Sequence, residues 1–180
     1  MRVLVSETPD KKTRSYINVE PDFLLKLIEN DYGLHEVIDM FNPDMPIRLF
    51  FDIDVEDIGD QPHSEYLTRT LTMLNAYYKT TDSDWTITSA NTDKKASYHI
   101  YSSKYYTTLK KLRNDILLIR CPYIDGEIYY FSLQSVKDEG SLRLPNQSKG
   151  SINKEGAIHR LFKGNLNDCL ITIIKGLTMI

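Results

Sequence analysis

Two aspartates stand one residue apart at the end of an apolar run, in the stretch IRLFFDIDVED at residues 47–57. Strand side chains alternate between the two faces of a sheet, so Asp52 and Asp54 would project from one face, about 7 Å apart along the strand. Two negative charges this close repel each other unless a positive charge lies near them. A divalent metal ion would supply that charge, so the pair predicts a candidate metal site.

A second stretch, KASYH at residues 95–99, carries three polar side chains at alternate positions. Lys95, Ser97 and His99 would share one face of a strand, for the same reason as the two aspartates. An ammonium group, a hydroxyl and an imidazole can all bind phosphate oxygens. The alternation also fits an ordinary core strand, so this stretch alone leaves both roles open.

A third carboxylate and two further cations follow along the chain. Asp125 precedes Gly126 in YIDGEIYY, and Arg143 and Lys149 are the first and last residues of the stretch RLPNQSK. Taken singly, an Asp-Gly pair also suits a turn, and the two cations also suit a solvated loop. Taken together, three carboxylates suit Mg²⁺ or Mn²⁺, and the cations suit a triphosphate. This combination is what nucleotidyl transfer requires.

The elements that would position these side chains can be placed from hydrophobic periodicity. Apolar residues at helical spacing predict four helices, with Pro21 and Gly33 bounding the first and Asn165 capping the last. The predicted helices are 21–32, 63–80, 107–121 and 165–177. Strands are predicted at 47–54, 84–90, 96–103, 127–133, 142–145 and 159–162, with the second and third joined as a β-hairpin.

Strands interspersed with helices in a chain of 180 residues predict one α+β domain with a mainly antiparallel sheet. Residues 1–45 are expected to form an N-terminal lobe or extension. Residues 46–180 are expected to form the core that carries the chemistry, with the last helix closing it.

The overall charge of −3 carries no global signature of nucleic-acid binding, so affinity for a template would need a local patch. The candidate patch is the basic stretch Lys104, Lys110, Lys111 and Arg113, which also fits the solvated face of a helix. The two cysteines form neither a four-cysteine zinc site nor a disulfide framework, so an intracellular location is expected. No window approaches the ~20 apolar residues of a transmembrane helix, so no membrane partner is expected.

The order of these motifs resembles that of the archaeo-eukaryotic primase superfamily, nearest to the primase module of large-DNA-virus primase-helicases and to primase-polymerases. The family pattern is an Asp-x-Asp after an apolar strand, a Ser-x-His, and an Asp after a hydrophobic residue. The last of these is Ile124-Asp125 here. The Lys before the Ser, the Arg and Lys six residues apart, and the stretch HRLFKGNLNDCLITII at 159–174 also match. The resemblance covers residues 46–175.

The resemblance implies an RRM-like, mainly antiparallel sheet facing a smaller α/β nucleotide-binding lobe. The catalytic metal ligands, for Mg²⁺ or Mn²⁺, would be Asp52, Asp54 and Asp125. The nucleotide-binding residues would be Lys95, Ser97, His99, Arg143 and Lys149. The implied activity is template-directed nucleotidyl transfer by a DNA primase or polymerase in viral DNA replication, inside the host cell. Its partners would be single-stranded DNA, nucleoside triphosphates and a replicative helicase, fused or separate.

Two other classes of function stay open. A metal-dependent nuclease also uses clustered carboxylates, although it needs no triphosphate-binding cations. A non-catalytic module that binds nucleotides or a replication partner would differ by a lost metal ligand. The apolar last residues, Leu177 to Ile180, predict that the polypeptide continues or that this end meets a partner. The alternative is that Met179 and Ile180 pack into the core.

Overall fold

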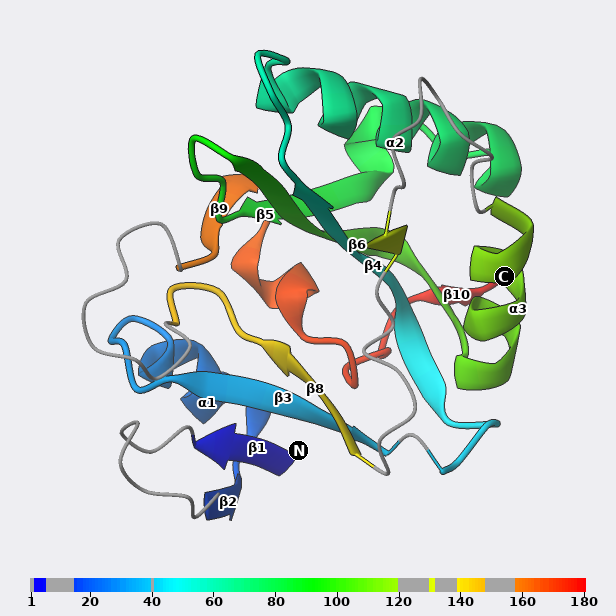
Figure 1. Ribbon diagram of the computed structural model, residues 1–180. Helices are drawn as coiled ribbons and strands as arrows, with labels where there is room; N and C mark the ends of the chain where they lie inside the picture. The colour runs from blue at the N-terminus through cyan, green and yellow to red at the C-terminus, as the bar shows by residue number, and fades with distance from the viewer. Residues whose placement is uncertain (1, 6–14, 40, 120–129, 132–138, 148–157) are drawn as a thin grey trace.

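The computed structural model of the protein is shown in Figure 1. It describes residues 2–5, 15–39, 41–119, 130–131, 139–147 and 158–180. Two of the predicted site residues, Asp125 and Lys149, and the cysteine at 121 lie outside the described residues.

A six-stranded sheet forms the centre of the fold, with the order β7-β4-β6-β5-β9 along its main path and β10 paired to β6. Neighbours along the main path are antiparallel, and β10 is parallel to β6. The predicted hairpin is confirmed as β5 and β6. The strands are β4 (Pro46–Glu56), β5 (Trp85–Ser89), β6 (Lys95–Thr108), β7 (Tyr130–Phe131), β9 (Arg160–Lys163) and β10 (Thr178–Met179).

Two long helices join the strands of this sheet. The helix α2 (His63–Tyr78) connects β4 to β5 through a 3₁₀ turn, η1 (Asp82–Asp84), and α3 (Leu109–Ile119) follows β6. The chain therefore runs β-α-β-β-α-β from β4 to β7, the order of ferredoxin-like folds. Both helices were predicted within two residues of these bounds.

The two helices cover one face of the large sheet (Figure 1). On that face Phe51 of β4 packs against Tyr78 of α2 and Trp85 of β5, with ring centroids 5.9 Å and 6.2 Å away. Because strand side chains alternate, Asp52 and Asp54 project from the opposite face of β4. The core that α2 and α3 build thus leaves the other face of the sheet for polar side chains.

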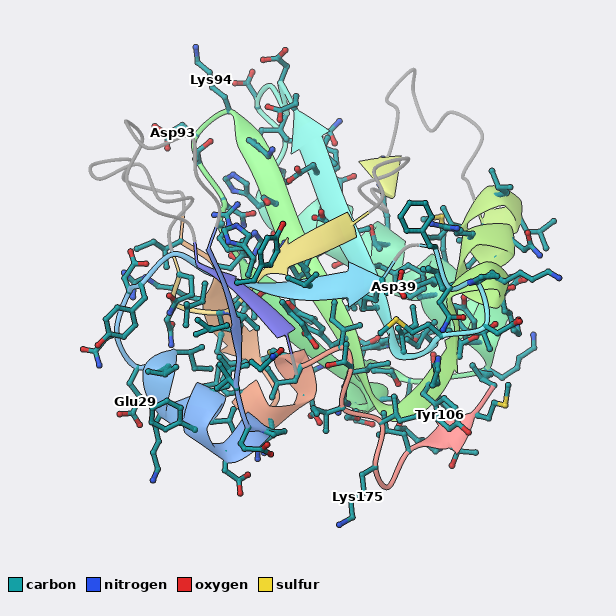
Figure 2. The ribbon with its side chains drawn as sticks, turned by 90° about the horizontal axis from the view of Figure 1, so that it is seen from below. Glu29, Asp39, Asp93, Lys94, Tyr106 and Lys175 are labelled. Atoms are coloured by element: carbon teal, nitrogen blue, oxygen red, sulfur yellow. The ribbon has the colours of Figure 1, made fainter. Side chains whose placement is uncertain are left out.

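A smaller antiparallel sheet lies on that other side, in the order β2-β1-β3-β8 (Figure 1). Figure 2 shows β3 and β8 crossing in front of β4 and β6 when the molecule is seen from below. The small sheet combines three strands from residues 1–45 with β8, which belongs to residues 46–180. The predicted N-terminal lobe and the predicted core therefore share this sheet. Its strands are β1 (Arg2–Val5), β2 (Ser15–Asn18), β3 (Leu34–Asp39) and β8 (Glu139–Arg143).

The short helix α1 (Pro21–Leu27) packs on the small sheet through Leu24, which is fully buried beside Leu34 and Leu144. The sequence predicted this helix up to residue 32, which is wrong at its C-terminal end. The chain leaves the helix at Ile28 and reaches a left-handed backbone conformation only at Gly33, with φ +65°. Gly33 therefore turns the chain into β3 rather than ending the helix.

The predicted closing helix at residues 165–177 is also wrong. Only a single 3₁₀ turn, η2 (Leu166–Cys169), forms there, and Asn165 caps it by accepting a hydrogen bond from the Asn167 N–H group. Four residues in a row, 171–174, are Ile, Thr, Ile and Ile. Because branching at Cβ restricts χ1 in a helix, such a run offers little helix propensity to oppose tertiary contacts.

Two buried charged side chains hold the segment after η2 in its non-helical form. The fully buried carboxylate of Glu36 accepts the N–H groups of Ile171 and Thr172, both at 2.7 Å. The guanidinium of Arg48 donates from Nε to the Leu170 carbonyl, at 3.1 Å. These bonds replace the backbone pairs that a helix would have made, so a tertiary contact outweighs the helical pattern of the sequence.

The described end of the chain pairs with the sheet. Thr178 and Met179 form β10 beside β6, and the Ile180 N–H donates to the Tyr106 carbonyl at 3.0 Å. Ile180 packs against the core, while Met179 is exposed. The fold class is α+β with a mainly antiparallel sheet, as the sequence predicted. Among the residues described, no helix is both long and apolar enough to cross a membrane.

Candidate functional site

The Asp-x-Asp and Lys-x-Ser-x-His motifs lie side by side on β4 and β6. The strand register pairs Asp52 with His99 and Asp54 with Ser97. Directly paired residues on neighbouring strands project from the same face of a sheet, with Cβ atoms about 5 Å apart. The predicted alternation within each motif is therefore confirmed, and both motifs present their side chains on one shared face.

At the outer end of this row, Lys95 lies between two carboxylates. Its Nζ is 3.0 Å from Asp54 Oδ2 and 2.7 Å from Glu56 Oε1. Partial burial alone would lower the pKa of Lys95, but the hydrogen bonds to Glu56 and Asp54 outweigh it and raise the pKa. Lys95 therefore stays an ammonium ion and supplies a positive charge to the carboxylate pair.

At the inner end of the row, His99 and Asp52 are both buried. His99 Nε2 lies 3.5 Å from Asp52 Oδ1, and its Nδ1 lies 3.1 Å from the Tyr101 hydroxyl. Both nitrogens of the imidazole thus face polar partners. A buried ring with its two nitrogens aligned in this way has a fixed orientation, which a ligand-binding group needs.

The turn of the β5–β6 hairpin fixes the backbone of Ser97. Asn91 Oδ1 accepts the Ser97 N–H at 2.8 Å, and the Ala90 N–H donates to the Ser97 carbonyl at 3.0 Å. Asn91 Nδ2 also donates to the Tyr98 hydroxyl, on the opposite face of β6. Asparagine suits this position because its short amide can bond to nearby backbone groups in a loop.

Arg143, at the end of β8, brings a cation from the small sheet towards the carboxylates. Burial lowers the pKa of Arg143, and the negative charges of Asp52 and Asp54 partly offset this. Its Nε and Nη1 atoms are buried and have no hydrogen-bond partner among the described residues. A guanidinium stays charged even so, and buried donors without partners are costly. The Nε and Nη1 atoms of Arg143 could therefore donate hydrogen bonds to a bound anion.

His159, just before β9, belongs to the same face and was not predicted from the sequence. Its side chain is buried, and its ring stacks on His99 with centroids 3.6 Å apart and an interplanar angle of 19°. Its Nε2 lies 3.4 Å from Ser97 Oγ. A single histidine far from the other motifs carries no spacing pattern, and its place at the start of the predicted strand at 159–162 was the only signal.

Exposure falls along the row of side chains. The Asp54 side chain is 34% exposed and that of Lys95 is 22% exposed, whereas that of Asp52 is 5% exposed. Figure 2 shows the open end, where the β5–β6 hairpin with Asp93 and Lys94 extends away from the body of the molecule. A ligand would therefore reach the row from the hairpin end and extend inwards towards His99.

Asp52 and Asp54 fit a hard divalent cation in their chemistry, because both offer carboxylate oxygens from one face of one strand. Within the described ranges, no group of three His, Cys, Asp or Glu side chains could hold a metal ion. The third predicted ligand, Asp125, and the second predicted loop cation, Lys149, are not among the residues described. The described part of the chain thus contains two of the three expected ligands.

The predicted basic stretch does not lie beside the second motif. Lys110, Lys111 and Arg113 are on α3, and Lys111 Nζ pairs with Asp115 Oδ2 at 2.7 Å. α3 follows the end of β6 that Tyr106 marks in Figure 2, opposite the hairpin. A template path over this stretch stays a prediction.

No protein-family model matches this chain, and no curated protein matches it at a significant level.

Proposed function

We propose that the protein is a metal-dependent nucleotidyltransferase that joins nucleoside triphosphates on a single-stranded DNA template, as a primase or polymerase. The observation that carries this proposal is the pairing of Asp52 and Asp54 with His99 and Ser97 across β4 and β6. Carboxylates for metal ions and donors for phosphates need to be within a few ångströms of each other in such an enzyme. Two motifs that are far apart in the sequence meet that requirement here.

The arrangement of strands supports the same proposal. The β-α-β-β-α-β order from β4 to β7 and the mainly antiparallel sheet are compatible with the RRM-like core of the archaeo-eukaryotic primases that the motifs resemble. The small sheet, which contributes Arg143 to the site, would correspond to the second lobe of that core. The residues that carry the chemistry would then lie between two sheets.

Asp52 and Asp54 would hold Mg²⁺ or Mn²⁺, together with Asp125. The metal ions would neutralise phosphate charge, favour the attacking 3′-hydroxyl as an alkoxide and stabilise the departing pyrophosphate. Lys95 now provides positive charge to Asp54, at 3.0 Å. Because a bound cation would take over that function, the Lys95 ammonium could then turn to a phosphate oxygen.

The remaining side chains would bind and orient the triphosphate. Ser97 and His99 offer a hydroxyl and an imidazole on the face that the carboxylates share. Arg143 offers the two unused N–H donors, and a guanidinium binds phosphate oxygens in pairs. By this reasoning, Arg143 approaches from the small sheet and holds the phosphates against β6.

These donors favour a transferase over a nuclease. A metal-dependent nuclease would use Asp52 and Asp54 but needs no triphosphate-binding cation. Arg143 has a buried Nε and Nη1 without a hydrogen-bond partner among the described residues, and it interacts electrostatically with both aspartates. The two functions give opposite products from the same mixture. The experiment incubates the protein with a labelled primer on a single-stranded template, the four nucleoside triphosphates and Mn²⁺ or Mg²⁺. A second reaction omits the primer.

Longer labelled strands, or new strands in the reaction without primer, are the expected products. They should require the template and disappear with EDTA. Shortened primer in place of extended primer would establish a nuclease. No change in either strand, with nucleotide binding intact, would establish a binding module.

A further inference from the structure

His159 lies at a junction between three segments that build the candidate site. Its Nδ1 is 3.2 Å from Thr88 Oγ1 on β5, and its Nε2 is 3.4 Å from Ser97 Oγ on β6. Its ring stacks on His99 at a centroid distance of 3.6 Å. One side chain therefore contacts Ser97 and His99, two of the three β6 residues that would bind the triphosphate.

The backbone of His159 reaches the third segment. Its carbonyl accepts the Asn146 N–H at 2.7 Å, three residues after Arg143. The neighbouring Gln147 is fully buried and accepts the N–H groups of Tyr32 and Leu34. The loop after β8 is thus tied to the small sheet on one side and to His159 on the other. His159 connects the β6 donors with the segment that carries Arg143.

These contacts define what His159 can do for a ligand. Both ring nitrogens face hydroxyl groups, at Thr88 and Ser97, and the side chain is only 1% exposed. The ring therefore acts through its neighbours rather than on a ligand directly. Thr88 sets the tilt of the ring from one nitrogen, and the other nitrogen sets the direction of the Ser97 hydroxyl. The stacked face blocks other rotamers of His99.

We propose that His159 is a positioning residue of the nucleotide site, which holds the Ser97 hydroxyl and the His99 ring in the orientation that receives a triphosphate. This inference rests on the proposed function, because it assigns His159 to the same site. It also assigns the separate β9 segment a role in nucleotide binding. A purely structural His159 would support folding without affecting Ser97 and His99 selectively.

Two variants separate the contacts. His159→Phe keeps a flat ring for stacking on His99 and removes both nitrogens. His159→Gln keeps a polar group near Ser97 and removes the ring. The control is His63→Phe, which loses a comparable bond from its Nε2 to the Thr92 carbonyl, outside the row of site residues. Melting temperatures of all variants report folding, and if His159→Phe does not fold, His159→Gln carries the test.

The experiment measures binding of dATP and of ATP, each with Mn²⁺, by calorimetry, and binding of single-stranded DNA by fluorescence anisotropy. We expect His159→Phe to weaken nucleotide binding about tenfold, as for residues that orient a liganding group, with DNA binding and melting temperature unchanged. In a Ser97→Ala background the same substitution should have little further effect, because its target hydroxyl is gone.

Four outcomes would overturn the role. Wild-type affinity in His159→Phe, or the same loss with and without Ser97, would show that His159 does not act through Ser97. Equal losses of nucleotide and DNA binding with a lower melting temperature would show a folding role only. If the wild-type protein itself binds neither dATP nor ATP, the proposed function fails first, and the role of His159 fails with it.

Discussion

Asp52 and His99 lie directly opposite each other on β4 and β6, with Oδ1 and Nε2 3.5 Å apart. Each belongs to a motif that alternates along its own strand, so this one pair fixes the relation between the two motifs. The carboxylates and the phosphate donors consequently share a face and form a single candidate site. The predictions below test this relationship, the cation that faces it and the contacts that support it.

Replacing His99 should separate nucleotide binding from template binding. His99→Ala removes a donor on the face of the carboxylates, and a hydrogen bond to a charged group contributes about 1.5–3 kcal/mol. We expect nucleotide affinity to fall roughly ten- to a hundredfold by the same principle, with DNA affinity unchanged. His63→Ala serves as the control. Equal losses for nucleotide and DNA would contradict the assignment, since they would indicate a damaged core strand.

Arg143→Met should abolish nucleotide binding without lowering the stability of the fold. Within the described part of the chain, the buried Nε and Nη1 of Arg143 have no hydrogen-bond partner, so an apolar side chain of similar length removes an uncompensated desolvation cost. We expect the melting temperature to stay level or rise while nucleotide binding is lost. Calorimetry and thermal denaturation of one preparation measure both. A marked loss of stability would show that the attraction of Arg143 to Asp52 and Asp54 holds the two sheets together.

The sequence predicted the parts of the site that depend on local periodicity. A period of two along residues 50–56 and 95–101 determines which side chains share a face, and the polar loop between 90 and 95 indicates a hairpin. The same patterns contain no information on the register between β4 and β6. That Asp52 meets His99 rather than Ser97 follows from the pairing of whole strands, which only the structure shows.

The errors in the predicted fold arose where tertiary contacts outweighed local preference. The segment after η2 has apolar residues at helical spacing, yet Glu36 and Arg48 bind its backbone, and it forms turns instead of a helix. Glu36 is itself a charged residue in β3, with no sequence signal that it would be buried. His159 was missed for the same reason, because its role depends on partners more than fifty residues away.

Glu36 gives a prediction with a defined pH dependence. Burial raises the pKa of Glu36, and the hydrogen bonds from Thr172 and Ile171 and the charge of Arg48 oppose this only in part. A group with a raised pKa in the folded state binds its proton more tightly there, so its stability contribution is lost as pH rises. The window begins near the unfolded value, about 4.3, and extends up to the higher folded pKa.

The test compares the wild type with Glu36→Gln, which cannot titrate. At the low end of the window we expect Glu36→Gln to be less stable by roughly 1–3 kcal/mol, since its amide N–H₂ would face backbone N–H groups. This difference should shrink as pH rises, as measured by urea denaturation at several pH values. Glu29→Gln, at an exposed position labelled in Figure 2, is the control. If the stability difference between the wild type and Glu36→Gln grew with pH, the N–H donors would lower the pKa of Glu36 instead.

Gly164 should be essential for the turn between β9 and η2. Its φ is +93°, and a Cβ atom there would lie 2.8 Å from the Thr86 Cα atom. Gly176 has a similar φ of +82° but has open space around it. We expect Gly176→Ala to cost about 1–2 kcal/mol through backbone strain, and Gly164→Ala to cost roughly 1–3 kcal/mol more through overpacking. Denaturation of the two variants measures this difference, and equal costs would refute the close approach to Thr86.

The most direct test of the central claim is nucleotide incorporation by Asp52→Asn, Asp54→Asn and the wild type on a primed single-stranded template with Mn²⁺. The control is Asp44→Asn. Asp44 is exposed and lies just before Pro46, the first residue of β4, whereas Asp52 and Asp54 lie near the last. We predict incorporation by the wild type and by Asp44→Asn, and a loss of roughly 10²–10³-fold or more in each of the other two, the range for removing one group that stabilises transition-state charge. Melting temperatures should stay close to that of the wild type. Incorporation by Asp52→Asn and Asp54→Asn at the wild-type rate would contradict the assignment of the Asp52–Asp54 pair as the catalytic metal site.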